Sequence, residues 1–371
     1  MPEELEFLSR SIPPPAYEIR DLGLLDDGRF CHATAINSDG EVVGEADTTE
    51  GIHAVVWRAY LLHDLMPLRY LSSRAVAIND DGFVLGVSEM QPNCGHVACL
   101  WTATGTVGPI WLDRLGITGD GVRAMNNAGQ IAGQMAFDEE RPPAAFLWHC
   151  GHVTDLTGRF VDGSTAESVN NFGQVAGHFT TLRQFDQAFF WSEHRMIDLG
   201  FGQARAINDH AMIAGLTYQG GGLPIACVWE DLQRREIPLL PGCVASESLS
   251  VNNSAEVCGT MTFADGGHTA FLWKREYVIN LNDVIDSALG WNLQEARTIN
   301  SSGQIAGWGF LEHRHHGYLL TPNDRAYTRA SSKPAPRQGA ERIEVPNIVT
   351  ERSESSFQDM ILQQILSEAN Q

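Results

Sequence analysis

A ten-residue phrase occurs seven times in this 371-residue chain, and its spacing restricts the possible folds more than any other feature. The copies read AINSDGEVVG, AINDDGFVLG, AMNNAGQIAG, SVNNFGQVAG, AINDHAMIAG, SVNNSAEVCG and TINSSGQIAG. The repeated asparagine is Asn37, Asn79, Asn126, Asn170, Asn208, Asn252 or Asn300, and successive copies lie 38 to 48 residues apart. A period of this length is typical of the four-stranded blades of a β-propeller. Seven copies therefore predict seven blades.

Each phrase predicts two short strands joined by a tight turn. An asparagine followed by two polar residues and a glycine provides the left-handed conformation that such turns need. The glycine is present in five copies, as Gly40, Gly82, Gly129, Gly173 and Gly303. Ala211 and Ala255 take its place in the other two, so we expect those turns to differ or to be strained.

A third strand follows each hairpin, and in six copies it ends in tryptophan, as in HAVVW and AAFLW. The tryptophans are Trp57, Trp101, Trp148, Trp191, Trp229 and Trp273. A ring repeated in the same position of every unit indicates packing between neighbouring blades. Weaker fourth strands follow, such as VTDLTG and MIDLG.

The seventh unit stops after its third strand, at GYLLTP, and the segment YEIRDLG near the N-terminus resembles the missing fourth strand. Pairing these two segments would close the ring inside one blade and leave no exposed sheet edge there. We therefore predict an all-β, seven-bladed propeller of four-stranded antiparallel blades over residues 17–322, closed by its N-terminal strand.

The seven phrases and the third strands resemble the bacterial HAF repeat ("extracellular repeat") family over about residues 17–322. The family is named for a His-Ala-Phe at the start of the third strand, where this chain keeps the histidine only as His53 and His316. The resemblance implies a propeller of mostly unassigned role. Many members are predicted to be exported, whereas this chain starts with an acidic, proline-rich leader at residues 1–16, so we expect a cytoplasmic protein.

Composition disfavours several classes of partner and cofactor. The chain has 46 acidic and 25 basic residues and a formal charge of -21, which disfavours nucleic acid. No stretch approaches eighteen apolar residues, so no membrane span is expected. The seven cysteines include no CxxC pair, which fits neither a disulfide framework nor a zinc site. We expect no cofactor and no bound metal.

The strand order predicts two different faces. The turns between strands one and two and between strands three and four share one face, called the turn face, and the remaining loops form the loop face. The loops of the loop face vary in length and are rich in acidic and aromatic residues, among them Tyr218 and Trp308. Such a face suits a basic peptide or a cationic or sugar-like ligand. The alternative is that the rings pack under the loops and the charges are only solvated.

One position of the repeat is expected to face the central channel. The residues three before each repeat asparagine are Thr34, Val76, Arg123, Glu167, Arg205, Leu249 and Arg297. The three arginines and Glu167 are candidates to bind an anion such as a carboxylate or phosphate. The alternative is a network of ion pairs, or packing between the blades.

The segment LEHRHHG holds the densest group of ionisable residues, namely Glu312, His313, His315 and His316. On an extended strand His313 and His315 share one side, which allows a shared ligand. No fourth metal ligand is evident, so a solvated loop is the favoured interpretation.

The C-terminal part lacks the repeat. Residues 323–354 read as a polar linker, and residues 355–371 predict a short amphipathic helix that begins with a capping box at Ser355 and Gln358. Its apolar side comprises Phe357, Met360, Ile361, Ile365 and Leu366. A helix this short needs a surface to pack on, which is the propeller itself, a second copy or a partner protein.

Two functions remain open at this point. The first is a scaffold that binds a protein or small-molecule ligand through the loop face, with the C-terminal helix as a docking element. The second is a hydrolase, lyase or cyclase acting on a small molecule or peptide at the channel mouth, with Glu167 or residues 312–316 as acid and base. The sequence contains no established catalytic motif, so no catalytic residue is assigned.

Overall fold

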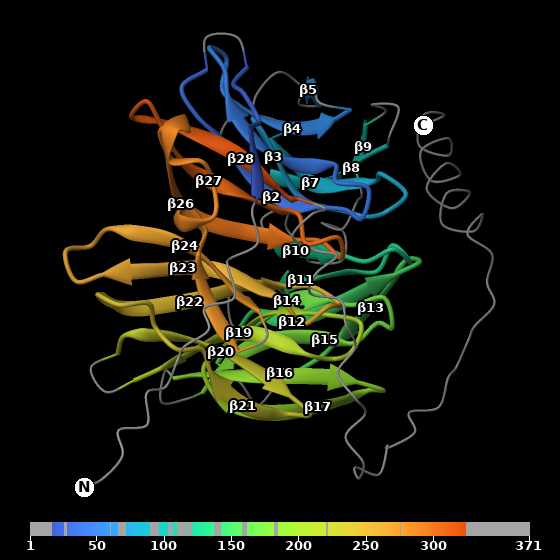
Figure 1. Cartoon of the computed structure of the whole chain (residues 1–371). Coiled ribbons are helices and arrows are strands. Elements are labelled where there is room, and N and C mark those ends of the chain that lie inside the picture. Colours follow the sequence, from blue (N-terminus) through green and yellow to red (C-terminus); the bar gives the residue numbers. More distant parts are fainter. Residues whose placement is uncertain are drawn as a thin grey trace, which may run out of the picture.

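The computed structural model describes residues 17–25, 28–59, 61–65, 72–89, 96–102, 107–109, 117, 121–136, 142–157, 162–181, 185–219, 222–274 and 276–323. These residues form seven four-stranded antiparallel sheets arranged around a channel, which confirms the predicted fold class (Figure 1). Within them, no helix is long and apolar enough to cross a bilayer. The predicted leader, linker and C-terminal helix lie outside the described residues.

Four consecutive strands make each of the first six blades, and the first strand of each blade lies next to the channel. Blades 1 to 3 are β2 (Cys31–Ile36), β3 (Val42–Asp47), β4 (Ile52–Arg58) and β5 (Leu61–Asp64); β6 (Ser73–Ile78), β7 (Val84–Glu89), β8 (His96–Trp101) and β9 (Val107–Pro109); and β10 (Val122–Met125), β11 (Ile131–Met135), β12 (Ala144–His149) and β13 (His152–Asp155).

Blades 4 to 6 repeat the same order. They are β14 (Ser164–Val169), β15 (Val175–Thr180), β16 (Asp186–Ser192) and β17 (Arg195–Phe201); β18 (Gln203–Ile207), β19 (Ile213–Tyr218), β20 (Pro224–Glu230) and β21 (Gln233–Glu236); and β22 (Cys243–Val251), β23 (Val257–Phe263), β24 (His268–Lys274) and β25 (Tyr277–Asn280). Two short 3₁₀ turns, η3 (Leu281–Asp283) and η4 (Ser287–Leu289), lead into blade 7.

Blade 7 joins the two ends of the propeller. It contains β26 (Trp291–Ile299), β27 (Ile305–Leu311) and β28 (Arg314–Pro322), and its fourth strand is β1 (Tyr17–Asp21). β1 pairs with β28 in an unbroken antiparallel register from Tyr17 opposite Pro322 to Asp21 opposite Tyr318. Figure 1 shows the blue β2 and β3 beside the orange β27 and β28. The predicted closure by the N-terminal strand is confirmed.

All seven repeat turns share one geometry. In the first, the Gly40 N–H donates to the Asn37 carbonyl at 3.1 Å and the Asn37 N–H donates to the Glu41 carbonyl at 3.0 Å. Gly40 has a φ of 80°, and Ala211 and Ala255 keep the same left-handed region with φ of 59° and 58°. The two alanine turns therefore do not differ in form, and their side chains lie where glycine is favoured.

Every inner strand contains a bulge at the same position. The register of β2 with β3 passes from Ala33 to Ala35 and skips Thr34, and the other six inner strands skip the equivalent residue. The last glycine of each phrase lies opposite this bulge. A Cβ on Gly44 would lie 1.9 Å from the carbonyl oxygen of His32, and the other six glycines meet equivalent backbone oxygens at 2.0 to 2.2 Å. The bulge therefore explains why the phrase ends in glycine.

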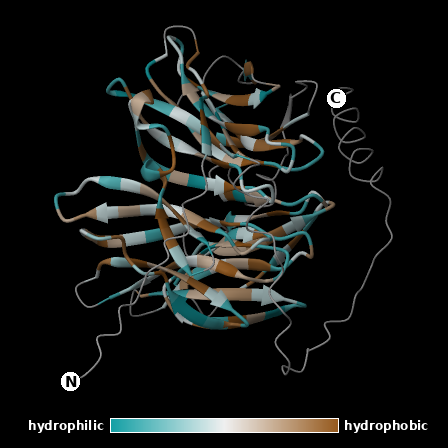
Figure 2. Cartoon of the chain, in the orientation of Figure 1, coloured by the Kyte–Doolittle hydropathy of each residue, from teal (hydrophilic) through white to brown (hydrophobic). Residues whose placement is uncertain are grey.

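Apolar side chains fill the space between adjacent blades. The described residues form seven buried clusters, and each spans two neighbouring blades. Trp57 of blade 1, for example, packs with Ala306 and Leu319 of blade 7. The six repeat tryptophans are at most 8% exposed, which confirms their predicted packing role. Figure 2 shows brown, hydrophobic segments in the strands and teal residues at many turns.

Candidate functional site

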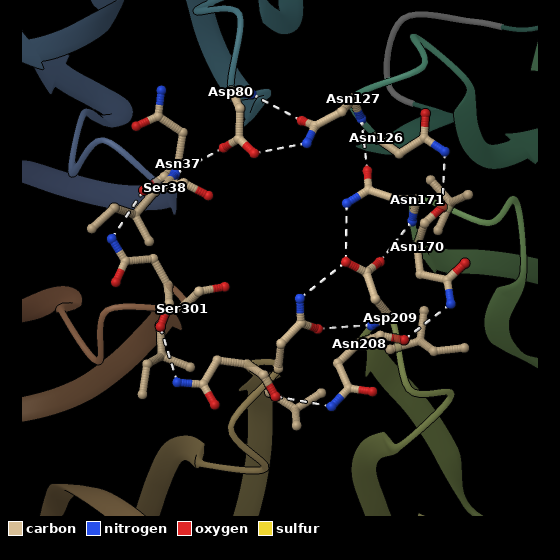
Figure 3. Close-up of a pocket in the computed structure, with 18 of the residues that line it drawn as sticks. Asn37, Ser38, Asp80, Asn126, Asn127, Asn170, Asn171, Asn208, Asp209 and Ser301 are labelled. Carbon is tan, nitrogen blue, oxygen red and sulfur yellow. Dashed lines mark hydrogen bonds between the residues drawn. The ribbon is translucent and has the colours of Figure 1, made fainter. Parts of the chain in front are cut away.

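The turn-face end of the channel is surrounded by the seven repeat asparagines, which are buried. Each Oδ1 accepts the backbone N–H four residues later, at 2.9 to 3.0 Å. In six of the seven copies, Nδ2 donates to the carbonyl of the next blade's asparagine at 2.8 to 3.2 Å, and the bond from Asn300 to Asn37 crosses the seam between the chain's two ends. The exception is Asn79, whose Nδ2 is buried without a hydrogen-bond partner among the described residues. Figure 3 shows this arrangement. The asparagines therefore join the blades as well as shaping the turns.

The residue after each asparagine adds a second layer to this ring. Five backbone N–H groups, from Ser38 to Asp209, donate to the side chain of the equivalent residue in the next blade, at 2.9 to 3.1 Å. The carboxylate of Asp80 also accepts from Asn127 Nδ2 at 2.7 Å. The ring encloses a polar recess of about 200 Å³ (Figure 3). Because its polar groups are largely paired with one another, this end serves to close the scaffold.

The loop-face end of the same strands is different in every blade. Three positions of each repeat lie at this end. They are the residue five before the repeat asparagine, the residue three before it and the residue eight after it. From blade 1 to blade 7 they are His32, Thr34 and Glu45; Arg74, Val76 and Val87; Gly121, Arg123 and Gln134; Thr165, Glu167 and His178; Gln203, Arg205 and Leu216; Glu247, Leu249 and Thr260; and Glu295, Arg297 and Trp308. Four arginines and four glutamates occur among them, so this end of the first and second strands has mixed charge. The acidic character predicted for the surrounding loops stays a prediction.

Blades 3 to 5 bring three of the predicted channel residues, Arg123, Glu167 and Arg205, together around a histidine. His178 Nδ1 lies 3.6 Å from Glu167 Oε1. The pKa of His178 lies below its usual value, mainly because burial disfavours the charged imidazole. The charges of Glu167 and Asp186 oppose this shift, whereas those of Arg205 and Arg123 add to it. Charged groups from three successive blades therefore act on one imidazole that is neutral near pH 7.

Arg205 lies between the histidine and the next blade. Its Nη2 is 3.9 Å from Glu247 Oε2, which is too far for a hydrogen bond. Its Nε is buried and has no hydrogen-bond partner among the described residues, and the same holds for His178 Nδ1. We call Arg123, Glu167, His178, Arg205 and Glu247 the charged cluster.

An aromatic row borders the charged cluster on the loop face. The rings of Phe185 and Phe201 lie 5.8 Å apart, and those of Phe201 and Tyr218 lie 5.3 Å apart. Phe185 is 53% exposed. Burial raises the pKa of Tyr218, the charges of Asp186 and Glu247 raise it further, and that of Arg205 lowers it. The predicted ligand residue Tyr218 therefore lies within electrostatic reach of the charged cluster.

Two other predicted residues lie apart from this cluster, in blade 7. Arg297 Nη1 is 3.8 Å from Glu295 Oε1 of its own strand. Trp308 stacks on His315 with ring centres 5.1 Å apart and planes 9° apart. Burial lowers the pKa of His315, and the neighbouring His32 lowers it further. The channel mouth therefore has a charged side in blades 3 to 6 and an aromatic side between blades 7 and 1.

The predicted group at residues 312–316 does not form one site. Glu312 and His313 are exposed turn residues with left-handed φ of 48° and 66°. His316 Nδ1 lies 3.0 Å from Asp21 Oδ1, across the seam with β1. Among the described residues, no three histidine, cysteine or acidic side chains are placed to hold a metal.

The buried cysteines are poor candidates for nucleophilic chemistry. Burial raises the pKa of Cys31, Cys99 and Cys227 to about 12, and it raises that of Cys258 still further. At neutral pH these thiols are protonated, whereas the thiolate is the reactive form. They act as small core residues.

Comparison with the models of known protein families gives no match, and comparison with curated proteins gives none either. Solved propellers are similar in fold. An oligogalacturonate lyase in complex with manganese is 12% identical over 85% of this chain and 96% of its own, with a TM-score of 0.55. The β-propeller domain of the trilobed protease from Pyrococcus furiosus is 8% identical over 79% and 94%, with a TM-score of 0.51.

TolB from Acinetobacter baumannii is 11% identical over 77% of this chain, which spans 64% of TolB, with a TM-score of 0.45. Likeness at such low identity establishes architecture alone, because one fold hosts many activities. The structure and these comparisons together show that the chain is a seven-bladed β-propeller protein.

Proposed function

We propose that the protein is a ligand-binding propeller whose site lies at the loop-face mouth of the channel, on the charged cluster. The observation that carries the proposal is the contrast between the two ends of the inner strands. At the turn face the same asparagine recurs in every blade, and its hydrogen bonds are used in joining the blades. At the loop face the combination of residues at the equivalent positions differs in every blade, and some of their charges are incompletely paired. We attribute the uniform residues of the turn face to packing and the varied residues of the loop face to ligand recognition.

The site is built on strands rather than on mobile segments. Glu167 and Arg205 are bulge residues of β14 and β18, and His178 lies in β15. Strand-borne groups keep their geometry without a ligand, which lowers the cost of ordering on binding. This favours recognition of a small molecule, or of a short segment of a partner protein, at the channel mouth.

The proposal has two further parts, both supported by sequence. Residues 355–371 form a second docking element, because their apolar residues recur at helical intervals. We also propose, from the pattern that all seven phrases share, that the chain is related to the HAF repeat proteins.

A ligand panel tests the binding site directly. Thermal unfolding is measured with amino acids, peptides, saccharides and small carboxylates, using the wild-type chain, Arg205→Met and Arg195→Met. Arg195 is an exposed arginine at the start of β17, on the turn face, and serves as the control. A ligand at 100 times its Kd stabilises the folded state by about 2.7 kcal/mol. We expect this gain in the wild type and in Arg195→Met, but not in Arg205→Met. Equal gains in all three proteins would contradict the proposal.

A second candidate function is supported by His178. A neutral imidazole beside a carboxylate and two arginines resembles a general base with groups that stabilise a developing anion. Proton abstraction next to a carboxylate, as in an elimination, is the reaction that this arrangement suits. His178→Gln would then abolish conversion of a bound ligand while retaining its binding. A ligand that binds and is recovered unchanged would argue against catalysis.

A further inference from the structure

The charged cluster contains opposite charges that lie close together but are not hydrogen-bonded to one another. Arg205 and Glu247 remain 3.9 Å apart, and His178 and Glu167 remain 3.6 Å apart. Neither carboxylate accepts a hydrogen bond within the part of the chain that the structure describes. Their strands hold these groups near each other but short of direct bonding.

Two kinds of ligand group would pair with the unpaired atoms of the charged cluster. Arg205 Nε has no acceptor, and the Arg205 side chain is 33% exposed, so its guanidinium would bind an oxyanion of the ligand. Glu167 and Glu247 are acceptors only, so an ammonium group would satisfy them. One ligand that carries both groups would complete both halves of the cluster.

The cluster presents both signs of charge to such a ligand. Arg205 is positive, and Glu167 and Glu247 are negative. A ligand with charge of one sign would leave the other half of the cluster unpaired, and unpaired charge in a partly buried site is unfavourable. A zwitterion pairs with both signs.

Asp186 adds negative charge near the cluster but no unpaired group, because both oxygens of its carboxylate accept hydrogen bonds. Its Oδ1 accepts from Thr180 Oγ1 at 3.0 Å, and its Oδ2 accepts from Gln203 Nε2 at 2.5 Å. It therefore holds the edge of the site in place and leaves the ligand's amino group to the two glutamates.

The aromatic row adds an apolar contact next to these charges. Phe185, Phe201 and Tyr218 form adjacent rings, and the first is mostly exposed. Such rings bind an apolar or aromatic side chain by burying apolar surface and, for an aromatic side chain, by edge-to-face packing. Resting on the proposed binding function, we infer that the ligand is a zwitterion, namely an amino acid or short peptide with free amino and carboxyl groups and an apolar side chain.

Titration calorimetry with blocked peptides tests the inference. The probes are L-alanyl-L-phenylalanine, its N-acetyl form, its C-terminal amide and the uncharged disaccharide maltose. We expect the wild type to bind the free dipeptide at least tenfold more tightly than either blocked form. Arg205→Met should bind the free dipeptide and its amide equally well. Glu247→Gln should bind the free dipeptide and its N-acetyl form equally well.

Two further variants keep the result interpretable. Glu167→Gln tests the amino-group side independently, and Arg195→Met should behave as the wild type, with circular dichroism confirming that each variant folds. Equal affinity of the wild type for free and blocked dipeptides would overturn the inference. Binding of maltose without the dipeptide would also overturn it while leaving the proposed site intact. Failure of the whole ligand panel would instead refute the proposed function.

Discussion

Replacing Asn170 by alanine removes four hydrogen bonds from the turn-face ring. Its Nδ2 donates to the Asn208 carbonyl at 3.0 Å and to Gln174 Oε1 at 2.7 Å. Its Oδ1 accepts from the N–H groups of Phe172 and Gln174 at 3.1 and 3.0 Å. The side chain belongs to a residue that is 4% exposed, so water replaces these bonds poorly. The change should loosen both the turn and the junction between blades 4 and 5.

The expected loss follows from the number of bonds and their burial. A net contribution of about 1 kcal/mol for each of roughly three fully lost bonds gives about 3 kcal/mol. A propeller of roughly 300 residues has an unfolding entropy near 2.1 cal/mol/K per residue, so the midpoint should fall by about 5 °C. Scanning calorimetry measures this shift directly.

Asn171→Ala is the matched control, because it removes the adjacent side chain. Asn171 also hydrogen-bonds across to the next blade, through Nδ2 to Asp209 Oδ2 at 3.1 Å, but its contacts are exposed. We expect a loss below about 1 kcal/mol, since exposed groups regain water. If the two alanine variants lose equal stability, the buried ring does not join the blades as described.

Three other changes test separate features. Ala211→Gly and Ala255→Gly should each stabilise the fold by about 0.5 to 1 kcal/mol, because glycine adopts the left-handed conformation with less strain than alanine, at some entropic cost. Urea titration will measure the change. Lys274→Met should cost about 3 kcal/mol, because it removes the ion-pair partner of Glu256, which is 1% exposed; adding Glu256→Gln should restore most of the loss in the same titration. Burial alone would raise the pKa of Asp47, but hydrogen bonds from two backbone N–H groups and an arginine lower it overall. Its stabilising effect is therefore present above the unfolded pKa of about 3.9 and is lost as the pH falls through the folded value, so Asp47→Asn should show a shallower loss of stability on acidification.

The blade number and the seam were predictable because both follow from local patterns. The phrase repeats at blade length, and the residues of β1 match the fourth strands of complete blades. The asparagine was predicted only as a turn residue. Its bond to the next blade joins residues 38 or more positions apart, and one copy of the phrase carries no information on that partner. The last glycine of the phrase was recognised but given no role for the same reason, because the bulge is a relation between two strands.

The candidate site was predictable only in part. Arg123, Glu167 and Arg205 were found because they share one distance from the repeat asparagine. His178 and Glu247 were missed, although they also occupy fixed repeat positions, eight after and five before the asparagine. Aligning the seven repeats and comparing every aligned position would have revealed them, because the positions five before and eight after the asparagine vary and include ionisable residues.

The residues of LEHRHHG are close along the chain but have different surroundings in the structure. His315 and His316 are neighbours in β28, and successive side chains of a strand point to opposite sides. One accordingly stacks on Trp308, and the other meets Asp21.

The bulge in each inner strand has a consequence for how such a protein acquires new specificity. The skipped residue has no partner opposite it in the ladder, so its side chain is freed from the cross-strand matching that fixes its neighbours. The architecture thereby separates most of these positions from the parts that hold the ring together, and the exception is Thr34, which donates to the Ala75 carbonyl of the next blade. New recognition surfaces can arise there, in nature or in the laboratory, by substitution at these sites with little disturbance to the frame that carries them.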